Sequence, residues 1–194
     1  MTREDQKLRS DSVRQAILDT ALEIGLEEGF EAVSVRKIIS RMKYSTGIVY
    51  HHFKDKQEII DAIEASQTQM FYSSIAQLMD GSVDELTKML KVFRRATQLA
   101  LDEPEKYNLI VLHKYSRNKS ADMPWLPRIA ASLEKEMKAG RIKQMNPHHA
   151  AFAIWSSFLG FNLMLSRMEG VTHEQADEMF KVQSKIIIEG VINT

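Results

Sequence analysis

The sequence is poor in the residues that crosslink chains or interrupt helices. Its 194 residues include no cysteine, four prolines and eight glycines. Without cysteine the chain can form neither a disulfide bond nor a thiolate metal site. Runs of strand-forming β-branched residues are almost absent, and apolar residues recur with the 3.6-residue period of a helix. We therefore predict an all-α protein with about nine helices.

The chain also lacks an excess of charge of either sign and a long hydrophobic run. Its formal net charge is zero. The longest nearly apolar stretch, from Ala150 to Leu165, is shorter than the roughly 20 residues that a membrane-spanning helix needs, and it contains polar side chains. The first residues do not have the pattern of a signal peptide. We expect a cytoplasmic protein without membrane contact.

Positive charge is nevertheless concentrated in residues 34–56. Six Lys and Arg residues stand there against one acid, Asp55. The six are Arg36, Lys37, Arg41, Lys43, Lys54 and Lys56. Two short helical patterns flank a turn in the same segment. Neutralising DNA phosphates requires clustered cations, and a helix fits the major groove, which is about 12 Å wide. The segment therefore predicts a DNA-binding helix-turn-helix.

The first helix of this pair has one apolar face. Val35, Ile38, Ile39 and Met42 follow the i, i+3, i+4, i+7 spacing of residues that pack inward. Ser34 precedes them, and its hydroxyl can accept a hydrogen bond from an unpaired backbone N–H of the first turn. We predict that the helix begins directly after this serine.

The second helix is expected to read DNA. Ser45 is a candidate for its N-cap. The side chains expected to be buried are Ile48, Val49 and Phe53. Those expected to face the groove are Thr46, Gly47, Tyr50 and His51. Gly47 costs about 1 kcal/mol of helix propensity relative to alanine, which is understandable if DNA must approach the backbone closely.

Residues 12 to 63 resemble the DNA-binding region of TetR-type transcriptional repressors. The similarity is carried by Ser34-Val35-Arg36-Lys37-Ile38 and by the stretch from Tyr44 to Lys56. The resemblance implies phosphate contacts from Ser34, Tyr50, His51 and Lys56, and base-edge contacts from Arg36, Thr46 and Gly47. The complete predicted DNA-binding set is Ser34, Arg36, Tyr44, Ser45, Thr46, Gly47, Tyr50, His51, Lys54 and Lys56.

One residue of the turn departs from the family pattern. Lys43 stands where the family usually has glycine, so its backbone must adopt the left-handed conformation that non-glycine residues enter uncommonly.

The remaining helices have recognisable boundaries. We predict a first helix from about Ser10 or Asp11 to Glu28, ended by Gly29. Asn146-Pro147 is a helix start, and Thr172-x-x-Gln175 is a capping box for the last helix. We assign residues 1–56 to a three-helix DNA-binding domain and residues 57–194 to a helical domain for ligand binding and dimerisation.

The last two helices carry more apolar side chains than one chain is expected to cover. The resemblance implies a four-helix homodimer interface here, which would hold two reading helices about 34 to 36 Å apart on a palindromic operator. The predicted interface residues are Phe152, Trp155, Leu159, Leu163, Phe180 and Ile187.

The second domain also contains aromatic and polar residues that suit a small apolar ligand. The resemblance implies an inducer pocket among them, whereas ordinary core packing is the alternative for each residue. The candidate pocket residues are Met70, Tyr107, His113, Trp125, Trp155, Phe158 and Asn162.

No pattern in the sequence indicates catalysis or a cofactor. Adjacent helical residues point about 100° apart, so the pairs His51-His52 and His148-His149 do not suggest a metal site. The sequence therefore predicts a DNA-binding regulator, not an enzyme, and a repressor released by a small molecule. Two alternatives stay open: a regulator without a small ligand, and an all-α interaction module that binds an acidic protein.

Overall fold

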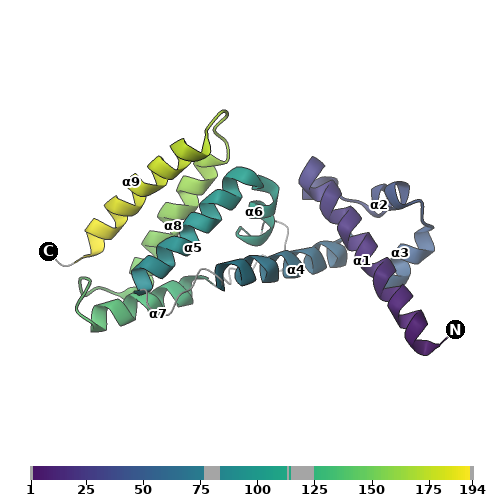
Figure 1. Cartoon of the computed structure of the whole chain (residues 1–194), viewed down its shortest axis with the longest axis horizontal. Helices are drawn as coiled ribbons and strands as arrows, with labels where there is room; N and C mark the ends of the chain where they lie inside the picture. The colour runs from purple at the N-terminus through teal and green to yellow at the C-terminus, as the bar shows by residue number, and fades with distance from the viewer. Residues whose placement is uncertain (1, 77–83, 113, 115–124, 193–194) are drawn as a thin grey trace. The chain divides into compact units, whose positions relative to one another are not determined.

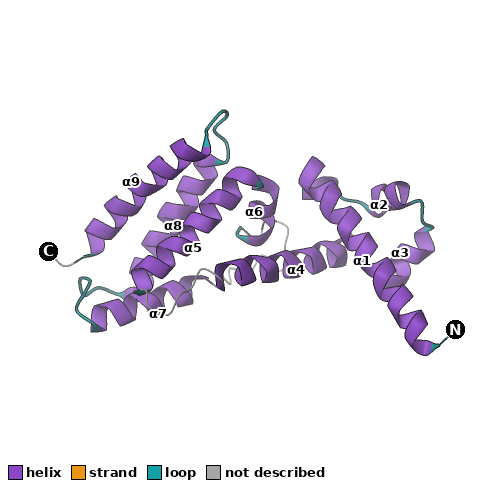
Figure 2. Ribbon diagram, viewed as in Figure 1, coloured by secondary structure: helices purple, strands orange, loops and turns teal. Residues whose placement is uncertain are grey.

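The computed structural model describes residues 2–76, 84–112, 114 and 125–192. Within these residues the chain forms nine α-helices and one short 3-10 helix, without a β-strand (Figure 2). The all-α prediction is therefore confirmed. Chain contacts divide the molecule into two compact units, formed by the described parts of Met1–Phe71 with Glu105–Lys119 and of Tyr72–Pro104 with Ser120–Thr194. The functional boundary after residue 56 stays a prediction.

The first unit contains the predicted DNA-binding segment. Its elements are α1 (Arg3–Glu28), η1 (Phe30–Ala32), α2 (Val35–Met42), α3 (Thr46–His52), most of α4 (Lys56–Ala76) and nearly all of α6 (Pro104–Ile110). Helix α1 packs against both α2 and α3 (Figure 1). Fully buried side chains of this unit include Ile17, Ile24, Phe30, Ile38, Val49, Phe53 and Ile59.

Helix α1 begins earlier than predicted. Its first residue is Arg3, because Thr2 and Asp5 form a capping box. The Thr2 hydroxyl accepts from the Asp5 N–H at 3.2 Å, and the Asp5 carboxylate accepts from the Thr2 N–H at 2.9 Å. The Thr-x-x-Asp pattern was the signal that could have revealed this start. The predicted end at Gly29, which has a φ of 87°, is confirmed.

Replacing Gly25 by alanine should destabilise the first unit by about 1–3 kcal/mol, the usual cost of overpacking. A Cβ at Gly25 would lie 2.5–2.7 Å from ring atoms of Phe30, whose side chain is fully buried. This clash should exceed the helix-propensity gain of about 1 kcal/mol. Urea unfolding followed by circular dichroism measures the change, and a variant as stable as the wild type would contradict the expectation.

The second unit is a helical bundle. It consists of the end of α4 together with α5 (Glu85–Asp102), α7 (Trp125–Lys138), α8 (Pro147–Leu165) and α9 (His173–Val191). Helix α5 packs against α7, α8 and α9, and α7 packs against α8 (Figure 1). The predicted starts of the last two helices are confirmed, because Asn146 caps α8 and Thr172 forms the capping box of α9. None of the described helices is long and apolar enough to cross a bilayer.

Stacked aromatic rings form the interior of this bundle. The Phe93 and Phe158 ring centroids are 4.1 Å apart, and those of Trp125 and Trp155 are 6.0 Å apart. The ring centroid of Phe180, in α9, lies 5.6 Å from that of Phe158. Large rings from four helices thus share one core, where aromatic burial contributes most of the packing energy.

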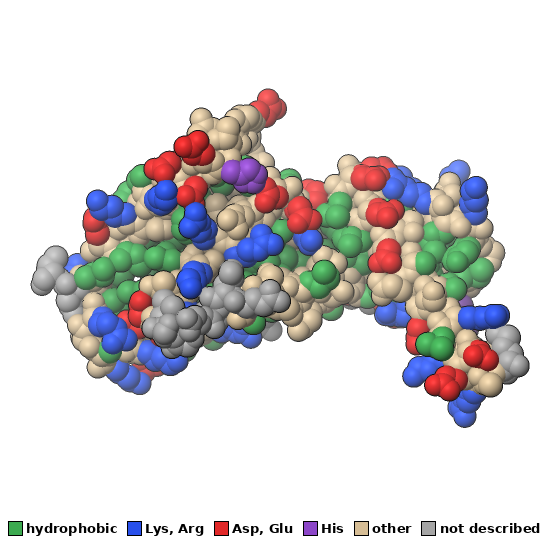
Figure 3. Space-filling model, in the orientation of Figure 1, with side chains coloured by type: hydrophobic (Ala, Val, Ile, Leu, Met, Phe, Trp, Pro, Cys, Tyr) green, Lys and Arg blue, Asp and Glu red, His purple; other side chains and the backbone are tan. Residues whose placement is uncertain are grey.

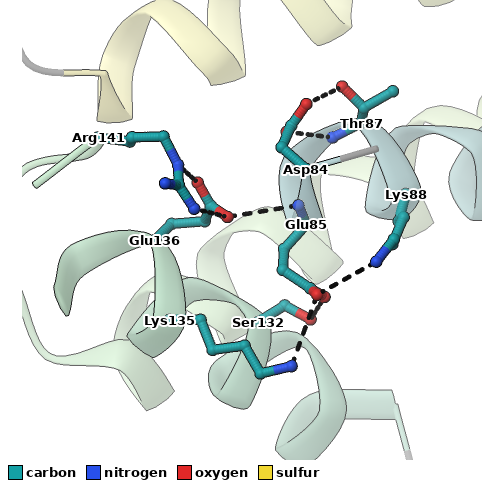
Figure 4. Close-up of polar contacts among 8 residues, drawn as sticks. All are labelled: Asp84, Glu85, Thr87, Lys88, Ser132, Lys135, Glu136 and Arg141. Carbon is teal, nitrogen blue, oxygen red and sulfur yellow. Dashed lines mark hydrogen bonds and ion pairs between the residues drawn. The ribbon is translucent and has the colours of Figure 1, made fainter. Parts of the chain in front are cut away.

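A buried carboxylate joins α7 to the start of α5 (Figure 4). The Glu136 side chain is 0% exposed and accepts two hydrogen bonds from the Arg141 guanidinium, at 2.6 and 2.9 Å. It also accepts the backbone N–H of Glu85 at 3.3 Å. Hydrogen bonding to Arg141 lowers the pKa of Glu136, against the opposing effect of burial. A charge can be buried here because it is paired.

Candidate nucleic-acid interface

Helix α2 starts where its sequence indicated, and of the four residues predicted to pack inward Ile38 is the one that is buried. Ser34 is extended, and its hydroxyl accepts the N–H of Lys37 at 3.2 Å. Ile38 is fully buried, whereas Arg36 is exposed. The predicted cap is confirmed. Ser34 is half-buried, so the hydroxyl that holds the helix start also lies near the surface.

The turn after α2 has the predicted left-handed residue. Lys43 has φ 57° and ψ 31°, and its N–H donates to the carbonyl oxygen of Ile39 at 2.9 Å. Tyr44 is half-buried and Ser45 is exposed. Ser45 occupies the N-cap position of α3, but its side chain forms no capping hydrogen bond.

Helix α3 buries one side and exposes the other. Val49 is fully buried, and Phe53, which ends the helix, is 1% exposed. Tyr50 is 55% exposed. The other exposed members of the predicted reading face are Thr46, Gly47 and His51.

Ile48 does not occupy the buried position predicted for it. Its side chain is 36% exposed. Successive helical residues turn by about 100°, so Ile48 lies well away from the side marked by Val49 and Phe53. Sequence reasoning missed it because any apolar residue in a short helix fits a buried interpretation. An exposed aliphatic group beside Gly47 suits contact with a thymine methyl.

Gly47 has open space around it. A Cβ built on this residue has no atom within 4 Å, and the residue lies inside α3 with the backbone of a helix. Neither crowding nor backbone conformation within this chain therefore requires glycine. With no side chain at this position, a partner outside the chain can approach the helix backbone closely.

Two of the six basic residues turn toward α1. Lys37 Nζ lies 2.5 Å from a carboxylate oxygen of Glu28, and Arg41 Nη2 lies 2.7 Å from Glu27 and 3.1 Å from Glu28. The hydrogen bond from Lys37 is the largest cause of the lowered pKa of Glu28. The positive charge of the segment is therefore smaller at its surface than the sequence alone suggested.

A third predicted cation is also engaged within the unit. Lys56 Nζ donates to the carbonyl oxygen of Glu31 at 2.7 Å, which joins the start of α4 to η1. Lys54 is exposed, and its backbone N–H donates to Glu58 at 2.6 Å. Arg36, Lys43 and Lys54 are exposed, and their charged groups take no part in the contacts described for Lys37, Arg41 and Lys56.

The two histidines of α3 differ in their surroundings. His51 is exposed, whereas His52 is half-buried, and their rings meet edge to face at 5.1 Å. Burial is the main cause of the lowered pKa of His52, with smaller contributions from the charges of His51 and Arg14. His52 is therefore neutral near pH 7 and adds no charge to the surface.

Sequence comparison identifies this helix-turn-helix. Residues 17–63 match the sequence model of bacterial regulatory proteins of the tetR family. This stretch is therefore a TetR-type DNA-binding region. The nicotine-responsive transcriptional repressor of Paenarthrobacter nicotinovorans is 35% identical to this chain over 71 residues, which make up 37% of each of the two chains. A match to a transcriptional repressor of Mycolicibacterium smegmatis is 22% identical and covers 58% of this chain and 54% of that one. The chain thus spans about a third to a half of the curated relatives that it matches first.

Solved structures extend the TetR-like fold over nearly the whole chain. The ketosteroid transcriptional regulator of Mycobacterium tuberculosis has a TM-score of 0.66 at 15% identity, over 93% of this chain and 95% of that one. A regulator solved with isovaleryl coenzyme A and operator DNA has a TM-score of 0.66 at 20% identity, over 88% and 97%. At such low identity these likenesses show the fold alone.

The predicted pocket residues are divided between the two units. Met70, which is 60% exposed, and Tyr107, which is 1% exposed, belong to the first unit. His113 lies outside the described residues. The buried members of the second unit are Trp125, Trp155, Phe158 and Asn162.

Within the second unit, one buried polar pair interrupts the aromatic core. The Thr97 hydroxyl donates to Asn162 Oδ1 at 2.8 Å, between α5 and α8. A groove of about 270 Å³ between α5 and α9 reaches Thr97 and Phe180 but is lined by residues outside the predicted pocket set.

The predicted dimer residues differ in how far they reach the surface. Phe152 is 56% exposed, whereas Trp155 and Phe180 are buried within the single chain. Leu159, Leu163 and Ile187 are half-buried. Three side chains outside the predicted interface set are more exposed than any of these, namely Met164, Val182 and Ile186. Hydrophobic side chains lie at the surface beside α9 (Figure 3).

Proposed function

We propose that this chain is a transcriptional repressor of the TetR family that binds a palindromic operator as a homodimer. The observation that carries the proposal is the outer face of α3, where Gly47 leaves open space among exposed polar side chains. A short helix with such a face can enter the major groove with its backbone close to the base pairs. The DNA-binding domain would comprise residues 1–56, and the protein would act in the cytoplasm.

Each predicted side chain has a proposed role in this docking. Tyr50, His51 and Ser34 would bind phosphates, while Arg36, Thr46 and Gly47 would lie at base edges. Tyr44, Ser45 and Lys54 would complete the interface. Lys56 would act mainly by holding the start of α4 against η1, since its ammonium group is bonded to Glu31.

The homodimer would form through α8 and α9. Phe152, Met164 and Ile186 are between 56% and 71% exposed, which is unusual for large apolar side chains. Exposed apolar surface of this kind is typical of interaction sites. The half-buried side chains of Leu159, Leu163 and Ile187 would add further apolar area to the interface. The buried side chains of Trp155 and Phe180 would hold the two helices in place from within the core.

A small apolar effector would release the operator. Relatives support a small-molecule effector as such, because one is named nicotine-responsive and one solved regulator holds isovaleryl coenzyme A. In this chain the candidate contacts are the aromatic core and the Thr97–Asn162 pair of the second unit. If the effector favours a state with weak DNA affinity, linkage requires a matching loss of operator binding, typically 1 to 3 kcal/mol.

Selection of bound sequences from random duplex DNA tests the proposal directly. The purified chain should enrich one palindrome at near-physiological salt, and its mass in solution should be that of a dimer. Absence of any enriched sequence, with weak and salt-sensitive binding only, would contradict it. The enriched duplex then serves as the probe for compounds that release the protein.

Lys37 should matter less for operator binding than Lys54, although both carry one positive charge. Lys37 is already paired with Glu28, whereas Lys54 is exposed. Lys54→Gln should lower the slope of log affinity against log salt by about 1.8, the value for one phosphate contact in each subunit of the dimer, and Lys37→Gln should leave it nearly unchanged. Fluorescence anisotropy titrations at several salt concentrations measure both slopes. Equal losses in the two variants would contradict this assignment.

A further inference from the structure

Helix α1 extends well beyond the part that packs into the first unit. Its first buried side chain is Ile17, although the helix begins at Arg3. The ten residues from 3 to 12 add about 15 Å of helix without a buried side chain. Such a segment gains no stability from tertiary packing. It is nevertheless ordered at its start by the capping box of Thr2 and Asp5.

The projecting part of α1 carries a basic stripe, which we define as Arg3, Lys7 and Arg14. At about 100° per residue, these three positions fall within about 40° of one another around the helix. The same face, followed toward the C-terminus, buries Ile17 and Ala21. All three basic side chains are exposed. The same face of α1 is therefore cationic in its N-terminal half and part of the core in its C-terminal half.

The acidic residues of the segment lie off this stripe. Glu4 and Asp11 fall about 60–80° around the helix from its centre, and Asp5 lies on the far side. Asp5 is also bonded to Thr2 in the capping box. Three of the four basic residues between positions 3 and 14 thus lie on one side of the helix, and the fourth, Arg9, lies on another face.

The basic stripe starts beside the reading helix. The Arg14 guanidinium lies 4.7 Å from the ring centroid of Phe53, the residue that ends α3. From there the N-terminal end of α1 runs on past α3 (Figure 1), and Lys and Arg side chains surround that end together with acidic ones (Figure 3). The stripe therefore continues the side of the unit that holds α3.

We propose that Arg3 and Lys7 bind phosphates of operator DNA outside the base pairs read by α3. The inference rests on the proposed function. Arg3 and Lys7 are one helical turn apart, about 6 Å along the axis of α1. Each DNA strand carries one phosphate per 3.4 Å of the duplex axis. Charge complementarity favours DNA as the occupant, because the stripe is cationic and borders the proposed DNA surface. The contacts lengthen the footprint without reading sequence.

Duplex length separates this contact from those of α3. The selected palindrome is prepared as a short duplex that ends at the half-sites and as a long duplex with flanking base pairs. Wild type should bind the long duplex more tightly. Arg3→Gln/Lys7→Gln should lose this advantage, with roughly tenfold weaker binding to the long duplex and a salt slope lower by about 3.6, for two phosphate contacts in each subunit of the dimer. Its affinity for the short duplex should equal that of wild type.

Two control variants sharpen the test. Arg9→Gln makes the same change as Arg3→Gln on a different face of the same segment and should bind both duplexes as wild type does. Arg3→Lys/Lys7→Arg keeps both charges and should also retain the length advantage. Circular dichroism checks that α1 keeps its helix in each variant.

The possible failures can be told apart. If wild type binds the palindrome but gains nothing from flanking base pairs, or if Arg3→Gln/Lys7→Gln keeps the gain, the flanking contact is wrong while the proposed function stands. If wild type selects no palindrome, both proposals are wrong.

Discussion

Replacing Arg141 by alanine should destabilise the second unit by about 3–5 kcal/mol, the usual cost of leaving a buried charge without its partner. Glu136 is 0% exposed and would keep only the backbone N–H of Glu85, at 3.3 Å. Both tryptophans of the chain lie in this unit. Tryptophan fluorescence during urea unfolding therefore measures the free energy of unfolding where the change is expected.

Replacing the other partner of this ion pair, Glu136, should reduce the free energy of unfolding less. Glu136→Gln leaves behind the Arg141 side chain, which is 55% exposed and remains hydrated. The loss should then be that of hydrogen bonds to a charged group, about 1.5–3 kcal/mol. Equal destabilisation by Arg141→Ala and Glu136→Gln would show that the burial of the carboxylate has no special weight, contrary to our expectation.

As the pH falls, the contribution of Glu136 to the free energy of unfolding should decrease in wild type and increase in Arg141→Ala. In wild type the pKa of Glu136 lies below its ordinary value of 4.5, so its stabilising contribution is present above that pH and is lost as the pH falls through the lowered pKa. In Arg141→Ala, burial without a partner should raise this pKa. The variant should therefore recover stability relative to wild type between about pH 7 and 5. A constant difference in unfolding free energy over this range would contradict the assignment.

Replacing Gly47 by alanine should separate stability from function. No atom lies within 4 Å of the added methyl group, so the first unit should gain up to about 1 kcal/mol from helix propensity. Operator affinity should fall at least tenfold, since the methyl group would occupy the space that the DNA needs, and 1.4 kcal/mol already corresponds to a factor of ten.

Thermal unfolding and operator titration measure the two effects of Gly47→Ala on the same preparation. Gly25→Ala is the matched control, because the identical substitution in another helix of the same unit should lower stability through contact with Phe30. A Gly47→Ala protein that binds the operator as tightly as wild type would mean that DNA does not approach this backbone.

The sequence by itself determined the helices and most of their ends. The caps at Ser34, Asn146 and Thr172 and the left-handed Lys43 were predictable because each depends on residues within one turn of the chain. The position and outer face of α3 followed for the same reason. Family resemblance then indicated the DNA-binding segment, whereas the early start of α1 was overlooked.

Tertiary structure decided which side chains are covered and which charges are paired. Glu28 neutralises Lys37 from nine positions away, and Ile48 stays at the surface because α3 is covered on one side only. Trp155 was predicted to lie in the dimer interface, but its side chain is buried within the bundle of the single chain. Helical periodicity is a local property that any apolar residue can satisfy, whereas burial and ion pairing depend on neighbours that only the packed chain brings together.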